Sequence, residues 1–86
     1  MHKFTYPVVF IFNEETKQHN GYIPDLAICA LGQNSEDVYA EMEIILRNFV
    51  YLSEKYSVEI PSPSTLDETV AKWPGYKVSL ISAEIK

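Results

Sequence analysis

The side chains that could act as nucleophiles or bases are few and widely spaced along this 86-residue chain. Nucleophilic catalysis needs a Ser, Cys or Thr beside a positioned base, but His2 is near the start and His19 is in a polar stretch. Cys29 is the only cysteine, in an apolar stretch where a thiol most often packs in the core. The sequence therefore predicts no catalytic residue and a protein that is not an enzyme.

The acidic residues are not spaced like metal ligands either. Glu14 and Glu15 fall in a polar segment that predicts a turn. Four more fall in the first half of a predicted helix, where negative charge stabilises the helix dipole: Glu36, Asp37, Glu41 and Glu43. The sequence has no HExxH motif, glycine-rich phosphate loop or DxDxDG calcium loop. We expect neither a metal ion nor a cofactor.

The bulk composition indicates a small acidic domain. The net charge of −5 disfavours direct binding to nucleic acid and suits docking on a basic protein. The longest apolar run, Pro7 to Phe12, is far shorter than the ~20 residues of a membrane helix. A lone cysteine and the lack of a signal-peptide pattern favour a cytoplasmic protein. We expect residues 1–86 to form one domain whose small core favours a homodimer or higher homo-oligomer.

Residues 4–32 have the pattern of three strands. Apolar and polar residues alternate from Phe4 to Phe12, and both faces of this first strand are apolar enough to be covered. A polar turn is expected from Asn13 to Gly21. Tyr22 to Leu26 and Ala27 to Leu31 should follow as one short strand, a Pro24-Asp25 break and a second short strand that ends at Gly32. The pattern predicts a three-stranded antiparallel meander.

The second half of the chain has the pattern of two helices and a strand. Asn34 is a good N-cap for a helix to about Lys55. Its predicted sheet-facing stripe is Val38, Met42, Ile45, Phe49 and Leu52. After a proline-rich connector, a Thr65/Glu68 capping box predicts a short helical turn, and residues 76–85 a final strand. The fold class is therefore α+β, with the long helix packed on the sheet.

Aromatic residues beside prolines could form a contact surface. Trp73 precedes Pro74, and the segment from Tyr22 to Asp25 contains Pro24. Aromatic residues are enriched in protein interfaces. The structural alternatives are a Trp that plugs the edge of the core and an Asp that caps a turn, which are the commoner roles.

Several short motifs occur in an order that resembles the HicB-like antitoxin family. They are Tyr6-Pro7-Val8-Val9-Phe10, Gly21-Tyr22, Ile23-Pro24-Asp25-Leu26, Cys29, Gly32 and Ile60-Pro61-Ser62-Pro63-Ser64, spanning about residues 4 to 64. The Gly21–Pro24 segment is shorter than in the family, and Ala27-Ile28 replaces a Pro-Gly before Cys29. The resemblance implies a partial ribonuclease-H-like fold without that fold's metal-binding carboxylates. It implies toxin binding but not operator binding, because the family's C-terminal DNA-binding module has no counterpart in this sequence.

The resemblance also implies a partner, a HicA-type toxin, which is a small basic ribonuclease that the antitoxin would block by occlusion. We expect binding through the acidic helix residues Glu36, Glu41 and Glu43, with Tyr22, Asp25 and Trp73 as anchors. One alternative is an orphan oligomeric scaffold or ligand-binding domain with neither toxin nor DNA partner. Another is a hydrolase that uses the ribonuclease-H-like frame and Mg²⁺.

Overall fold

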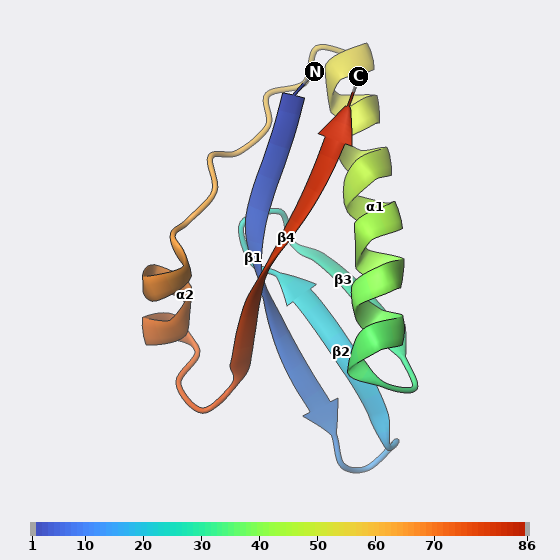
Figure 1. The fold of residues 1–86 in the computed structure, drawn as a ribbon, viewed down its shortest axis with the longest axis vertical. Coiled ribbons are helices and arrows are strands. Elements are labelled where there is room, and N and C mark those ends of the chain that lie inside the picture. Colours follow the sequence, from blue (N-terminus) through green and yellow to red (C-terminus); the bar gives the residue numbers. More distant parts are fainter. Residues whose placement is uncertain (1, 86) are drawn as a thin grey trace.

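The computed structural model describes residues 2–85, which form one antiparallel sheet with a helix on either side (Figure 1). In chain order the elements are β1 (His2–Asn13), β2 (Gln18–Ile23), β3 (Ile28–Gly32), α1 (Ser35–Lys55), α2 (Leu66–Lys72) and β4 (Lys77–Ile85). α1 runs along one face of the sheet, and α2 lies on the opposite side of β1 and β4 (Figure 1). The predicted α+β class is confirmed.

The sheet has four strands in the order β3-β2-β1-β4, not the three of the predicted meander. β1, β2 and β3 do form a meander, but β4 belongs to the same sheet. It pairs with β1 along nearly its whole length, from Lys3 opposite Glu84 to Phe10 opposite Lys77. The long strand β1 therefore lies in the interior of the sheet, which fits its two apolar faces.

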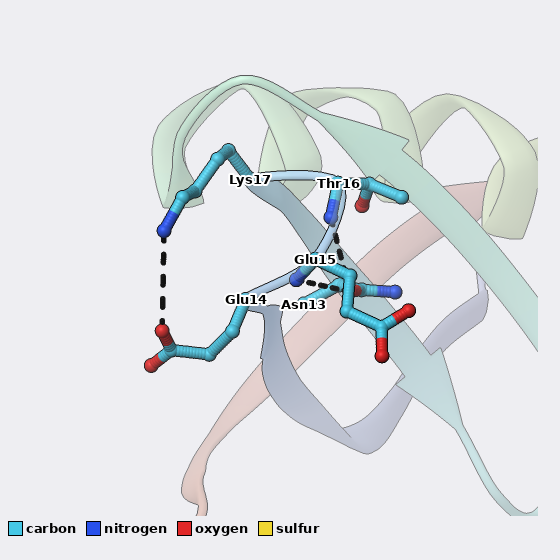
Figure 2. A network of polar contacts seen from close by, with 5 residues as sticks. All are labelled: Asn13, Glu14, Glu15, Thr16 and Lys17. Atoms are coloured by element: carbon cyan, nitrogen blue, oxygen red, sulfur yellow. Dashed lines mark hydrogen bonds and ion pairs between the residues drawn. The ribbon is translucent and has the colours of Figure 1, made fainter.

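β2 starts earlier than the sequence indicated. The polar residues from Gln18 to Asn20 pair with Asn13, Phe12 and Ile11 of β1, and these backbone pairings extend β2 toward the turn. The turn is correspondingly shorter: the Asn13 Oδ1 accepts from the N–H groups of Glu15 and Thr16, at 3.0 and 3.3 Å (Figure 2). Lys17 closes the turn with a φ of 58°.

The predicted strand from Tyr22 to Leu26 is also too long. β2 ends at Ile23, and Leu26 donates its N–H to the Ile23 carbonyl in a turn. Ala27 has a φ of 54°, a conformation that strands do not use. The predicted Pro24-Asp25 break is therefore part of the turn between β2 and β3, which spans residues 24–27.

The core lies between α1 and the sheet. Its fully buried members include Tyr6 and Val8 from β1, Ile23 from β2 and Ile81 from β4. The helix contributes Val38, Met42, Leu46 and Val50 at a strict spacing of four. α1 approaches β2 so closely that a Cβ on Gly21 would lie 2.5 Å from the Val38 Cγ1, so this strand position requires glycine.

Two sequence-based core assignments were wrong. Leu52 is 49% exposed, because it lies to one side of the stripe that the four-residue spacing defines. Cys29 is exposed, because it is on edge strand β3 and points to the face that α1 does not cover.

The segment between the helices is attached to the sheet by hydrogen bonds. The buried Tyr6 hydroxyl donates to the Pro61 carbonyl at 2.5 Å. The predicted capping box forms at Thr65 and Glu68, and the bonds from Thr65 hold the pKa of the Glu68 carboxyl below its usual value.

Within residues 2–85, neither α1 nor α2 has the length and apolar character that a membrane-spanning helix needs.

Candidate protein-binding surfaces

The acidic residues predicted to bind a partner lie on two different flanks of α1. Glu36 and Glu41 are exposed and Glu43 is half-buried. Seven residues make almost two helical turns, so Glu36 and Glu43 share a flank within about 20°. Glu41 lies about 200° from Glu43 around the axis. The three carboxylates therefore do not form one cluster.

The flank with Glu36 and Glu43 is the one above β4. Tyr39 lies about 40° from Glu43 around the helix, and its hydroxyl donates to the Leu80 carbonyl of β4 at 3.1 Å. Glu54 is exposed and lies eleven residues after Glu43, within about 20° of the same direction. We call Glu36, Glu43 and Glu54 the acidic flank.

Tyr22 and Trp73 are brought together on the other side of the sheet. Their rings meet edge to face with centroids 5.8 Å apart, and Tyr76 meets Trp73 in the same way at 6.0 Å. Tyr22 and Trp73 are half-buried, and Tyr76 is 47% exposed. Trp73, at the C-terminal end of α2, thus lies between Tyr22 and Tyr76, and part of its ring stays accessible. These rings and the acidic flank are separated by the sheet.

Asp25 has a structural role. Its Oδ2 accepts from the Ser64 N–H at 2.9 Å, and its Oδ1 accepts from the Ser64 hydroxyl at 2.6 Å. Both carboxylate oxygens are therefore used to join the β2–β3 turn to the connector that leads to α2. We call this pair the Asp25–Ser64 tether.

A surface without charge extends from the ring cluster across the sheet. The register places Val78, Val9, Tyr22 and Cys29 in one cross-strand row, and Ile11, Asn20 and Leu31 in the next. Strand alternation points both rows away from α1. The neutral sheet face is the accessible part of these rows with the neighbouring rings: Ile11, Asn20, Tyr22, Cys29, Leu31, Trp73 and Tyr76.

Sequence reasoning missed most of this face, although a signal was present. Val9 and Ile11 made the second face of β1 apolar, and Cys29 and Leu31 do the same for β3. Leu31 is 59% exposed. The Oδ1 of Asn20, between Ile11 and Leu31, is buried and has no hydrogen-bond donor within residues 2–85.

The described part of the chain contains no cluster of potential metal ligands. In residues 2–85 no three His, Cys, Asp or Glu side chains lie close enough to share a metal ion. A shallow cavity lies where the start of α1 meets β1 and β4, lined by Phe10, Ser35, Glu36, Tyr39, Lys77 and Ser79. The Lys77 ammonium lies 5.6 Å from the centroid of the Phe10 ring.

The fold defines an α+β domain with a four-stranded antiparallel sheet, one long helix on one face and a short helix partly covering the other. It matches the crystal structure of the N-terminal domain of the Burkholderia pseudomallei antitoxin HicB with a TM-score of 0.83. The match covers 95% of this chain and 100% of that domain, at 16% sequence identity. The HicB-like fold inferred from the motif order is thereby confirmed. No protein-family model and no curated protein matches the sequence.

Proposed function

We propose that this chain is an antitoxin-like protein that binds and occludes a small ribonuclease of the HicA kind. The observation that carries the proposal is the match, over nearly the whole chain, to the N-terminal domain of an antitoxin. In this function residues 1–86 act as one non-enzymatic, cytoplasmic domain with a partial ribonuclease-H-like frame. Inhibition requires only that the partner's RNA-binding surface be covered, so binding alone is sufficient and this chain needs no catalytic step.

The charge of the chain supports such a partner. A ribonuclease must attract a polyanion, so its substrate-binding surface is basic. A protein of net charge −5 is attracted to the same surface and competes with RNA for it. Opposite potentials also raise the association rate, an advantage for an inhibitor that must capture its target quickly.

The acidic flank is the part of α1 that we propose for this contact. Glu36, Glu43 and Glu54 line one side of a rigid helix, so their spacing is fixed before binding. Of the other predicted contact residues, Glu41 is on the opposite flank, and Asp25 is engaged by Ser64. Tyr22 and Trp73 lie across the sheet and would meet a different molecule or a different part of the same one.

The test is co-expression of this chain with a HicA-type protein encoded beside it, followed by purification of the complex. Cleavage of an RNA substrate by that protein should stop when the chain is added in equimolar amount. A partner that does not bind, or a bound partner that still cleaves RNA at its full rate, would refute the proposed function.

Charge reversal tests the contact surface separately. The double variant Glu36→Lys/Glu43→Lys should lower the association rate about tenfold at low salt and flatten its salt dependence. Glu41→Lys is the matched control from the opposite flank of the same helix. If Glu41→Lys slows association more than the double variant, the acidic flank is not the contact.

The alternative of an orphan oligomeric scaffold is favoured by one feature, the uncharged sheet face opposite α1. A stable oligomer of this chain with no affinity for any HicA-type protein would support that alternative over the antitoxin.

A further inference from the structure

We infer that the outer face of α1 holds the basic ribonuclease through an apolar centre formed by Ile44 and Tyr51, beside the acidic flank. The proposal rests on the proposed function, since the partner is the same ribonuclease of the HicA kind. It adds a division of roles: the exposed carboxylates attract the partner, and the two apolar side chains keep it bound. We call Ile44 and Tyr51 the apolar pair.

The apolar pair lies on the side of α1 that points away from the sheet. Ile44 is about 160° around the helix axis from both Met42 and Leu46, which are fully buried where α1 packs on the sheet (Figure 1). Tyr51 follows seven residues later, so it shares the direction of Ile44 within about 20° and lies about 10 Å further along the axis. Their exposed fractions are 52% and 53%. A helix that only covers a sheet carries polar residues on this side, so the fold itself makes little use of these two side chains.

Carboxylates lie directly beside the apolar pair. Tyr51 is about 60° around the axis from Glu54, and Ile44 is about 80° from Glu36, so the acidic flank borders the pair along its whole length. α1 contains five acidic residues and two basic ones, and the segment from Ser35 to Ile44 contains four acidic residues and no basic one. An apolar centre with a polar, charged rim is the usual arrangement of a protein interface.

The sign of this rim identifies the occupant as a basic protein. Negative charge attracts lysine and arginine side chains, but it repels RNA and a second chain of net charge −5. The neutral sheet face has no such preference, because no charged residue occurs in its two cross-strand rows. The matching surface of the ribonuclease is therefore an apolar patch bordered by lysine or arginine residues.

The two parts of the surface act on different rate constants. Exposed charges mainly set the association rate, because they steer the encounter over a distance that salt screens. Apolar side chains that become buried mainly slow dissociation, and tyrosine is among the residues that contribute most to binding energy. Both parts are on one rigid helix, so their spacing is fixed before the partner arrives.

The test is the binding kinetics of the full chain with the HicA-type ribonuclease encoded beside it, measured by surface plasmon resonance. Ile44→Ala and Tyr51→Ala should each raise the dissociation rate about tenfold, and the double variant about 100-fold, while the association rate changes less than about twofold. Leu52→Ala is the matched control: Leu52 is 49% exposed on the same helix, but about 80° from Ile44 on the side away from the acidic flank. It should leave both rates unchanged. Circular dichroism establishes that each variant is folded.

The proposed function and this contact fail in different ways. A wild-type chain that binds no HicA-type ribonuclease overturns both. A ribonuclease that the wild-type chain binds and silences, with a dissociation rate that the alanine double variant leaves unchanged, overturns only the contact. So does a Leu52→Ala variant that speeds dissociation as much as the double variant. Sedimentation of the chain alone adds one more outcome: an oligomer that the double variant dissociates would mean that a second copy occupies the surface, against the proposal.

Salt dependence separates the apolar pair from the acidic flank. Ile44→Ala/Tyr51→Ala changes no charge, so its association rate should fall with salt as steeply as that of the wild-type chain. Glu36→Lys/Glu43→Lys should show the opposite pattern, with a flatter salt dependence and a dissociation rate close to that of the wild-type chain. If the alanine double variant flattens the salt dependence and leaves the dissociation rate unchanged, the proposed division of roles is wrong.

Discussion

Replacing Asp25 with alanine should destabilise the protein without weakening partner binding. The change removes both bonds of the Asp25–Ser64 tether, and each is charge-assisted and part-buried. Hydrogen bonds to charged groups contribute about 1.5–3 kcal/mol each, but water can replace part of both here, so we expect a loss of about 2–3 kcal/mol. A domain of this length has roughly 4–13 kcal/mol of stability, so the midpoint of thermal unfolding should fall by about 8–20 °C.

Ser64→Ala removes only the hydroxyl bond and should cost about 1–2 kcal/mol, because the Ser64 N–H still donates to the carboxylate. In the double variant the two losses should not add, since both changes remove the same hydroxyl bond. Urea unfolding followed by circular dichroism measures all three. Glu59→Ala, an exposed acid in the same connector, is the control and should change little. Unchanged stability of Asp25→Ala together with weaker partner binding would refute the tether and restore Asp25 as an anchor.

Three further substitutions test the packing. Gly21→Ala should cost about 1–3 kcal/mol in urea unfolding, because its Cβ would lie 2.5 Å from Val38, and adding Val38→Ala should recover part of the loss of Gly21→Ala. Asn20→Val should stabilise the protein by about 1 kcal/mol in the same assay, because the buried, undonated Oδ1 is removed. Burial, followed by the charge of Asp25, raises the pKa of the Tyr6 hydroxyl. The neutral hydroxyl therefore contributes fully to the stability of the fold below about pH 10, and this contribution is lost as the pH rises through the raised pKa. Tyr6→Phe should be less stable at neutral pH but should lose less in alkaline thermal melts.

The parts of the fold that the sequence predicted are those that local chemistry determines. The Asn34 cap accepts from the Asp37 N–H at 2.9 Å, and the capping box at Thr65 forms as its spacing indicates. The alternation from Phe4 to Phe12 identified β1. Each of these signals lies within a few residues of the structure that it determines.

The predictions were wrong where contacts with residues far away in the sequence determine the local structure. Gln18 to Asn20 look like a turn, but β1 offers them hydrogen-bond partners and makes them a strand. Cys29 looks like a core residue, but β3 is an edge strand whose outer face has no helix.

The prediction of contact residues also lacked information about which residues lie close together in the folded domain. Glu36, Glu41 and Glu43 are close in sequence, but helical geometry separates Glu41 from the other two. Tyr22 and Trp73 are fifty-one positions apart and touch only because α2 folds back over the sheet. Their separation from α1 by the sheet becomes visible only when the whole domain is assembled.

The two faces of the sheet should respond differently to salt. Contacts through the acidic flank depend on exposed charge, which salt screens over about 8–10 Å at physiological ionic strength. Contacts through the neutral sheet face depend on apolar burial, which salt does not screen. Raising the salt concentration should therefore slow association with a basic ribonuclease if the acidic flank makes the contact. If the association rate does not change with salt, exposed charge does not steer the encounter and the acidic flank is not the contact.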